Sequence, residues 1–318
     1  MYRGRRTGNS RFRRACKVRA LKNNFRIGLL SFSLYAAYSI WAQLTPSSLN
    51  LHVNHTIAGH ALSVARDIQR MYGFVFVMYV DAAFLPMTRS WLCHTDTQVI
   101  EQTLFVTSTL LVSEGLNSSG ARHVYSLGHF EQQTGSAYGQ KIYYETVFKR
   151  AHFILELLRD GITLWIIESD SVWFGDPSPV LRNFRGQDVI AGQDGDLNDR
   201  IPEGGFLFLN STSHTIVLWE SLVNWQSKIL GNSREAEIGD LGNEMLQLPH
   251  LLKSSNCTWS FFPVDSFVSG KWYSSSAMRK QSTPLVIQNN WIVGLESKVK
   301  RAQSWGHWYL SPNGERCI

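Results

Sequence analysis

Short hydrophobic runs separated by polar segments give the first outline of this chain. The run 74–80 is rich in aromatic and β-branched residues and ends at Asp81, which predicts a buried strand. The run 103–107 predicts a second strand, and residues 121–126 predict a third, shorter one. Between the first two strands, residues 91–93 suit the start of a helix. The chain therefore begins as strands that alternate with helical segments.

A long amphipathic helix is predicted over residues 138–160, because apolar side chains recur at helical spacing and Gly161 follows as a stop. The apolar run 164–167 comes next, predicts a buried strand, and is followed by Glu168 and Asp170. Side chains two residues apart on a strand share a face, so these two carboxylates are expected to stand together. Like charges repel unless a cation joins them, and carboxylate oxygens suit Mg²⁺ or Mn²⁺. A solvated turn is the alternative interpretation of an isolated acid-x-acid triplet.

The second half of the chain continues the alternation. Residues 188–194 predict a short strand that leads into an acidic loop, and residues 204–209 predict a further strand. The glycines that open this strand, Gly204 and Gly205, indicate that a ligand approaches the backbone closely. Residues 216–225 follow with a helical pattern.

Strands and helices that alternate at these intervals predict an α/β fold with a mostly parallel sheet and helices on both faces. Ligands of such sheets bind beyond the carboxyl ends of the strands, where Glu168 and Asp170 stand. No G-x-G-x-x-G or Walker loop follows the first strand, which argues against dinucleotide oxidoreductases and P-loop enzymes.

Charge divides the chain into two parts. The net charge of the 318 residues is +6, but residues 1–26 alone hold ten Lys or Arg and no acid. Residues 27–44 form a stretch of 18 residues without charge, long enough as a helix to cover roughly 27 Å of a thin bilayer. The positive-inside rule then predicts a single-pass type II membrane protein with its C-terminal part luminal. We expect a stem over residues 45–66 and a catalytic domain over residues 67–318.

A cleaved signal peptide is the rival interpretation of the apolar stretch, but the basic region is long and no clear small-x-small cleavage site follows. Four N-glycosylation sequons lie on the predicted luminal side, beginning at Asn54, Asn117, Asn210 and Asn256. Cys93, Cys257 and Cys317 would face an oxidising lumen, where they allow at most one internal disulfide whose pairing the sequence does not choose. No Cys/His cluster has zinc spacing, so the fold must rest on its hydrophobic core.

Motifs spread over residues 73–310 resemble the nucleotide-diphospho-sugar transferase family of GT-A glycosyltransferases, which includes the plant rhamnogalacturonan xylosyltransferases and extensin arabinosyltransferases. The stretches that carry the resemblance follow one another in a consistent order, which makes chance agreement improbable. They are Ala83-Phe-Leu-Pro86 with Trp91-Leu-Cys93, Thr103–Thr107, Tyr138-Gly with Tyr143-Tyr144, Glu168-Ser-Asp-Ser-Val-Trp173 with Asp176-Pro177, Gly205-Phe206, and Gln288-Asn-Asn-Trp-Ile-Val-Gly294. The resemblance implies a GT-A type sheet and a Golgi membrane location.

A metal site is implied by the resemblance, with Asp170 as direct ligand of a divalent cation, Mn²⁺ in the first place. Glu168 would contact the metal or the ribose, and it stands where the family usually has Asp. Gln288 stands where a His is common, and its amide oxygen can still bind a hard cation. His307 is an alternative ligand.

The donor would be a nucleotide sugar, a UDP-sugar in the first place, and the acceptor a hydroxyl of a glycan or glycoprotein. The residues expected to bind the donor, besides the two acids, are Gly204, Gly205, Asn289 and Trp291. Glu203 falls beside the presumed donor sugar, where relatives often carry Asn.

The implied reaction is a retaining hexosyl or pentosyl transfer, in which the departing diphosphate oxygen can itself take the acceptor proton. Asp194, Glu203, Asp240 and Glu244 are the candidates for a carboxylate that stabilises the developing charge on the sugar or attacks it. For Asp240 and Glu244, which lie on the segment 238–246, solvated helix acids are the alternative.

Lys149 and Arg150 are placed on a solvated helix face, although either can reach a nucleotide. A catalytically inactive Golgi protein that binds glycans or scaffolds other transferases is the alternative function, because Glu168 and Gln288 both depart from the family pattern. A nucleic-acid-binding function is not expected, since the basic charge ends at the apolar segment and the remainder holds 21 bases against 25 acids.

Overall fold

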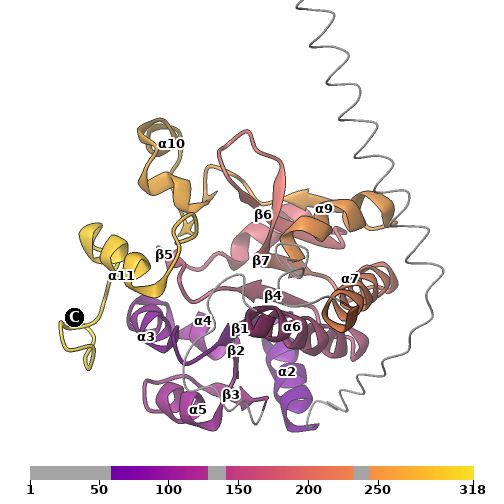
Figure 1. The fold of residues 1–318 in the computed structure, drawn as a ribbon, viewed down its shortest axis with the longest axis horizontal. Coiled ribbons are helices and arrows are strands. Elements are labelled where there is room, and N and C mark those ends of the chain that lie inside the picture. Colours follow the sequence, from indigo (N-terminus) through magenta and orange to yellow (C-terminus); the bar gives the residue numbers. More distant parts are fainter. Residues whose placement is uncertain (1–58, 128–140, 233–243) are drawn as a thin grey trace, which may run out of the picture. The chain divides into compact units, whose positions relative to one another are not determined.

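The computed structural model of this chain describes residues 59–127, 141–232 and 244–318 (Figure 1). All of them belong to one compact unit, Asn54–Ile318. Within these three ranges no helix is long and apolar enough to cross a membrane. The predicted anchor at residues 27–44 lies outside the described residues, so the membrane topology stays a prediction.

Seven strands form the central sheet in the order β3–β2–β1–β4–β7–β6–β8. Every neighbouring pair is parallel except the two that involve β7, which runs antiparallel between β4 and β6. This order confirms the predicted mostly parallel sheet. The strands are β1 (Val75–Val80), β2 (Thr103–Thr107), β3 (His123–Ser126), β4 (Leu164–Ile167), β6 (Val189–Asp194), β7 (Ile201–Leu209) and β8 (Trp259–Phe261).

A second, smaller sheet contains the strand that follows β4 in the chain. It joins β5 (Val172–Trp173), β10 (Val286–Ile287) and β9 (Phe267–Val268). Because β10 pairs with β5, it brings residues from the last part of the sequence beside the turn that follows β4. This pairing is what builds the candidate site from two distant stretches.

The helices of the described ranges surround the central sheet. They are α2 (Gly59–Tyr72), α3 (Leu85–His94), α4 (Thr97–Glu101), α5 (Leu110–Asn117), α6 (Lys141–Arg159), α7 (Ser213–Asn232), α9 (Glu244–Ser254), α10 (Ser276–Gln281) and α11 (Leu295–Ser304), with 3₁₀ turns η1 (Ser178–Phe184) and η3 (Gly270–Tyr273). The prediction that residues 91–93 start a helix was wrong. They end α3, which begins near Pro86, a residue suited to a first helical turn.

Helix α2 begins inside the range expected to be a stem. Its Ala61, Ala65 and Ile68 are buried. Its Arg66 reaches Asp160 at the end of α6, with Nε 2.7 Å from Oδ2. The folded domain therefore starts at least as early as Gly59 rather than at residue 67.

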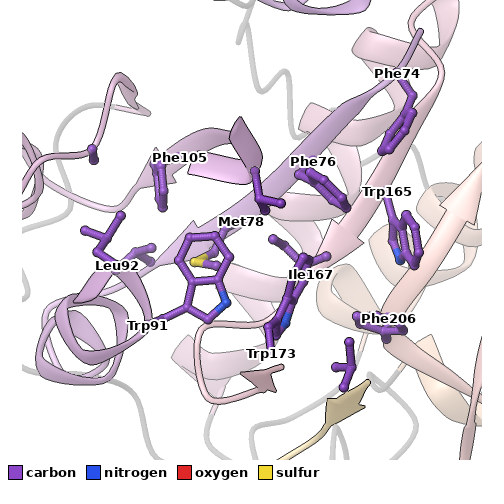
Figure 2. Packing of buried hydrophobic residues seen from close by; sticks show 14 of the residues in the cluster. Phe74, Phe76, Met78, Trp91, Leu92, Phe105, Trp165, Ile167, Trp173 and Phe206 are labelled. Atoms are coloured by element: carbon purple, nitrogen blue, oxygen red, sulfur yellow. The ribbon is translucent and has the colours of Figure 1, made fainter. Parts of the chain in front are cut away.

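One face of the sheet carries an aromatic core. Alternate residues of neighbouring strands, including Phe76, Phe105 and Trp165, belong to one buried cluster with Trp91 of α3. Figure 2 shows these rings around Met78. Trp165 stacks on Phe262 with 4.6 Å between the ring centroids. Offset and edge-on ring packing of this kind adds to the hydrophobic stabilisation and fixes the position of β4.

Helix α6 covers the opposite face. The side chains of Val77, Val106 and Ile166 point there and meet Phe153 and Ile154 of α6. Helix α7 lies beside α6 (Figure 1), and its Trp219 is hydrogen-bonded to α6 by Nε1 to the carbonyl oxygen of Ala151 at 2.9 Å. Helices thus cover both faces of the sheet, as predicted.

A disulfide joins Cys93 at the end of α3 to Cys317, and Cys257 is the free, buried thiol of the described ranges. This pairing selects one of the three alternatives that the sequence left open.

Replacing both Cys93 and Cys317 with serine is expected to lower the free energy of unfolding by about 2–5 kcal/mol, because the loop is long and a disulfide restricts the unfolded chain. Urea unfolding measures this loss, with Cys257→Ala as the control that keeps the bond. An unchanged midpoint in the double variant would refute a structural role for the bond.

Candidate active site

A cavity of about 470 Å³ opens at the carboxyl ends of β1 and β4. Its wall combines the ends of these strands, one face of α6 and the segment that leads into α11. The lining residues are Tyr79, Asp81, Ala83, Phe84, Tyr143, Thr146, Val147, Arg150, Ile167, Glu168, Ser169, Asp170, Ile292, Val293, Gly294, Leu295 and Lys298. The volume and the mixture of aromatic and charged groups are those of a small-molecule site.

Glu168 and Asp170 both line this cavity, but they are not arranged as predicted. Strand β4 ends at Ile167, and the acids lie on a turn, not on a shared strand face. The turn is closed by Ser171, whose backbone N–H and hydroxyl both donate to the carbonyl oxygen of Glu168, at 3.2 and 2.6 Å. The turn gives the two carboxylates different exposure to solvent: the Glu168 side chain is 35% exposed, whereas the Asp170 side chain is 3% exposed.

Asp170 accepts a short hydrogen bond from the ammonium group of Lys298, which is on α11. Burial alone lowers the pKa of Lys298, but the neighbouring Asp170 outweighs burial and the pKa is raised. The lysine therefore carries its charge at neutral pH. A cation already balances this buried carboxylate.

Helix α11 is fixed in place by the buried Asn289. The Asn289 side chain donates to the carbonyl oxygen of Lys298 at 3.1 Å and accepts from Nε of Arg301 at 2.7 Å. Asn289 does not line the cavity. The structure therefore places it as a support for the helix that carries Lys298, and donor binding by Asn289 stays a prediction.

Glu168 lies directly over Gly205 of β7. A Cβ atom at Gly205 would stand 2.2 Å from Cδ of Glu168, so any other residue there would push the Glu168 carboxylate out of its position. A bulge in β7 beside Ala191 and Gly192 brings this part of the strand out of regular pairing. Burial, followed by the charge of Asp170, raises the pKa of Glu168. The close backbone approach that the glycines indicated is thus an approach by Glu168 itself.

Arg150 is one of the site residues that sequence reasoning misplaced. Its guanidinium Nη1 lies 3.7 Å from Oε1 of Glu168, and its side chain is 18% exposed. The solvated-face interpretation was therefore wrong for Arg150. Four residues at helical spacing line the cavity: Tyr143, Thr146, Val147 and Arg150. This spacing is visible in the sequence, but it identifies Arg150 as a site residue only when the face of α6 that meets the cavity is known.

A second pair of acids, Asp194 and Glu203, is joined by Asn290. The amide Nδ2 of Asn290 donates to Oε1 of Glu203 at 2.7 Å and to Oδ1 of Asp194 at 3.2 Å. Glu203 is 3% exposed. Burial, and then the charges of Glu168, Asp194 and Asp170, raise the pKa of Glu203 well above its ordinary value. Burial also raises the pKa of Asp194. Asn290 is part of the sequence motif Gln288-Asn-Asn-Trp291, but no role at the site was predicted for it.

Trp291 belongs to this second pair. Its indole Nε1 donates to Oδ1 of Asp194 at 2.7 Å, and its backbone φ of 59° is left-handed. The ring is 54% exposed and carries the ammonium group of Lys271 at 4.1 Å from the centroid. Trp291 is therefore an exposed ring held in one orientation beside the acids, and its predicted contact with a donor sugar stays a prediction.

The donor atoms around Asp170 fit a hard divalent cation. Gln288 is 3% exposed, and neither its amide nitrogen nor its amide oxygen has a hydrogen-bond partner. The antiparallel register that pairs Ile287 with Val172 places Gln288 opposite Ser171, next to Asp170. Two carboxylates and one amide oxygen are ligands that Mg²⁺ and Mn²⁺ accept.

Other metal ligands are less well placed. In the described parts of the chain no three His, Cys, Asp or Glu side chains come together as a metal site, so Gln288 would complete the set. His307, the alternative ligand, borders a small cavity that Asp170 also borders, but its Nδ1 is 2.9 Å from the hydroxyl of Tyr273. That contact leaves only Nε2 of His307 available.

The remaining candidates are not placed at this site. Asp240 lies outside the described residues, and Glu244 is the first residue of α9. Gly204 is buried within β7. The catalytic roles of Asp194, Glu203, Asp240 and Glu244 all stay predictions.

Glu203→Gln is expected to change how stability depends on pH. The raised pKa means that the folded state keeps its proton after the unfolded chain has lost it. The native protein therefore loses stability as pH rises from the ordinary glutamate value up to the folded pKa, and the glutamine variant lacks that part of the loss. Urea unfolding at pH 5 and pH 8 measures the difference, with exposed Glu114→Gln as control. Equal losses in the two variants would rule out the buried, protonated state of Glu203.

The known proteins to which this chain is similar are sugar transferases. The sequence profile of a family described as nucleotide-diphospho-sugar transferase matches residues 114–302. The chain is 25% identical over 204 residues to the beta-arabinofuranosyltransferase RAY1 of Arabidopsis thaliana, a match that spans 57% of this chain and only 37% of that protein. It is 22% identical over 335 residues to the UDP-D-xylose:L-fucose alpha-1,3-D-xylosyltransferase 3 of the same plant, across 92% of this chain and 85% of that one.

A solved structure shows a weaker likeness. The glycosyltransferase GlyE of Streptococcus pneumoniae TIGR4 aligns with a TM-score of 0.44 and 13% identity, over 75% of this chain and 65% of the other.

Proposed function

Because the chain belongs to the nucleotide-diphospho-sugar transferase family, we propose that it transfers a sugar from a nucleotide diphosphate, in the first place a UDP-sugar, to a hydroxyl group of a glycan or glycoprotein. The observation that carries the proposal is the cavity at the ends of β1 and β4, where Glu168 and Asp170 meet the cations Arg150 and Lys298. The named relatives, which transfer xylose or arabinofuranose, favour a pentose as the sugar.

The lining of the cavity suits the two halves of a nucleotide. Tyr79, Phe84 and Tyr143 offer aromatic surface for a base and ribose. Lys298 and the first residues of α11, Gly294 and Leu295, offer positive charge and backbone N–H groups for a diphosphate. The nucleotide would therefore lie with its diphosphate toward the turn after β4.

A divalent cation, Mn²⁺ in the first place, would be held by Asp170, Glu168 and the amide oxygen of Gln288. Such an ion supplies stabilisation of the charge that builds on the departing diphosphate. The protein's own contribution is positional. The turn closed by Ser171 sets Glu168 and Asp170 in the cavity wall, and β10 brings Gln288 opposite Ser171.

The reaction we propose retains the configuration of the sugar. As the bond to the diphosphate breaks, positive charge develops on the sugar, and a carboxylate nearby stabilises it. Asp194 is the acid of the second pair that we favour for this role, because it is less buried than Glu203 and the bond from Trp291 opposes part of the rise in pKa that its burial causes. Glu203, whose pKa burial raises well above its ordinary value, suits a hydrogen-bonding role toward a sugar hydroxyl.

Calorimetric titration of the full-length protein with UDP, in the presence of Mn²⁺, tests the proposed donor. Micromolar binding that ADP does not match is expected. No binding at millimolar UDP would count against the donor site and favour the inactive Golgi protein that binds glycans or scaffolds other transferases.

We also propose that the enzyme is a single-pass type II protein of the Golgi membrane with a luminal catalytic domain. The disulfide Cys93–Cys317 and the exposed sequon residues Asn117 and Asn256 support a lumenal compartment. Digestion with an N-glycosidase is expected to shift the mass of the membrane-bound protein, and Asn117→Gln together with Asn256→Gln to remove most of the shift. A full-length protein whose C-terminal tag is cut by protease in sealed microsomes would have the opposite topology.

A further inference from the structure

The contact between Lys298 and Asp170 is unusual for a residue expected to bind a metal. The ammonium group bonds Oδ2 of Asp170, and the lysine side chain is 16% exposed. A buried ion pair of this kind persists because either charge alone is costly to bury. The lysine therefore occupies Oδ2, one of the two carboxylate oxygens of Asp170.

The backbone of Lys298 is held in place, whereas its side chain can rotate. Its carbonyl oxygen is held by Asn289, and Arg301, one turn further along α11, is held by the side chain of Asn289 and by the carbonyl oxygen of Asn290 at 2.5 Å. The helix is thus anchored, while the lysine side chain has four rotatable carbon bonds and only the Asp170 contact and the Phe84 ring, 5.3 Å away, to hold it. The ammonium group can leave Asp170 without movement of α11.

A divalent cation at Oδ1 of Asp170 and the ammonium group at Oδ2 would lie close together in a buried site, and the repulsion between the two positive charges makes their joint binding costly. The second acid does not offer an alternative first ligand, because Glu168 faces Arg150 and the third oxygen, on Gln288, carries no charge. The metal must therefore displace Lys298. An arriving diphosphate supplies the negative charge that the displaced ammonium group needs.

We propose that Lys298 is a positioning residue that blocks the metal site of the free enzyme and releases it only when a nucleoside diphosphate enters the cavity. The proposal rests on the proposed function for the identity of the diphosphate. Its consequence is a binding order: metal and nucleotide bind together, and metal alone binds weakly. Free metal ions without nucleotide would then leave the site unoccupied.

The test measures free Mn²⁺ by electron paramagnetic resonance during titration of the full-length protein without nucleotide. Lys298→Met keeps the length of the side chain and removes its charge, and is expected to bind Mn²⁺ at least tenfold more tightly than the native protein. Lys300→Met is the matched control, because Lys300 pairs on the surface with Glu296 and lies two residues along the same helix. It is expected to bind as the native protein does.

Two additional arms separate the outcomes. Adding Asp170→Asn to Lys298→Met is expected to abolish the gain, which identifies Asp170 as the oxygen in question. Adding UDP to the native protein is expected to raise Mn²⁺ affinity at least tenfold, and this arm does not require the variant to fold. Native protein that binds Mn²⁺ without nucleotide as tightly as Lys298→Met would overturn the proposal. A gain in Lys298→Met with no effect of UDP would uphold the block by lysine and count against UDP as the donor nucleotide.

Discussion

Asp170→Asn is expected to reduce sugar transfer by roughly a hundredfold to a thousandfold. The change removes the charge that would hold a cation against the departing diphosphate, and removing one electrostatic stabiliser of a transition state costs about this much. It keeps the size of the side chain. Release of UDP from the donor, measured at saturating donor concentration with the full-length protein, gives the ratio of the two rates.

The change at Asp170 also leaves Lys298 buried without its partner, which can destabilise the fold by about 3–5 kcal/mol. Circular dichroism therefore accompanies the assay, and the double variant with Lys298→Met removes the unpaired charge. Asp176→Asn is the matched control, because Asp176 lies in the same segment and caps the turn at Ser178 with a 2.8 Å bond. Equal loss in Asp170→Asn and Asp176→Asn would contradict a special role of Asp170.

Gly205→Ala is expected to lower transfer by about a hundredfold, because displacement of a catalytic constellation by about 1 Å has an effect of that order. The added methyl group would stand 2.2 Å from Cδ of Glu168, so the carboxylate must move out of its position beside Arg150. The atoms that must give way are the end of a flexible, partly exposed side chain, so the loss of stability should be small. Comparison of transfer rate with thermal unfolding separates the two effects.

The control for Gly205→Ala is Gly59→Ala, where a Cβ atom meets nothing within 4 Å. This change at the start of α2 is expected to leave the rate unchanged and to keep or slightly raise stability. If Gly205→Ala kept full activity, Glu168 would not need its observed position.

The strands were predictable because burial on both faces of a parallel sheet leaves uninterrupted apolar runs. The run 103–107 is β2 residue for residue, and the run 74–80 contains β1. Helix α6 followed equally well from its spacing. The end of α3 did not, since residues 91–93 are apolar for a reason the local pattern does not reveal. Trp91 packs against Trp173, which comes from a distant part of the sequence.

The candidate site was predictable only in part. Glu168 and Asp170 could be identified because they follow an apolar run directly, and both line the cavity. The geometry between them did not follow from strand alternation, because the backbone turns at Glu168 and the hydroxyl of Ser171 closes that turn. A local rule about strands cannot foresee a hydrogen bond that ends the strand.

Lys298, Asn290 and Arg150 needed the tertiary structure. Lys298 is one of several lysines near the C-terminus, and its partner Asp170 lies 128 residues earlier. Asn290 joins Asp194 to Glu203 only because β10 places it between β6 and β7. The disulfide was undetermined for the same reason, since a choice among three cysteines depends on which ends of the fold meet.

Transfer measured with a panel of UDP-sugars tests the central claim most directly. The full-length protein is incubated with Mn²⁺, a glycan acceptor, and UDP-xylose, UDP-arabinofuranose, UDP-galactose or UDP-glucose, and released UDP is measured with and without acceptor. We predict acceptor-dependent release from one donor, with a pentose donor preferred, and its loss in Asp170→Asn. No release above buffer from any donor, or equal release from the native and Asp170→Asn proteins, would contradict the account.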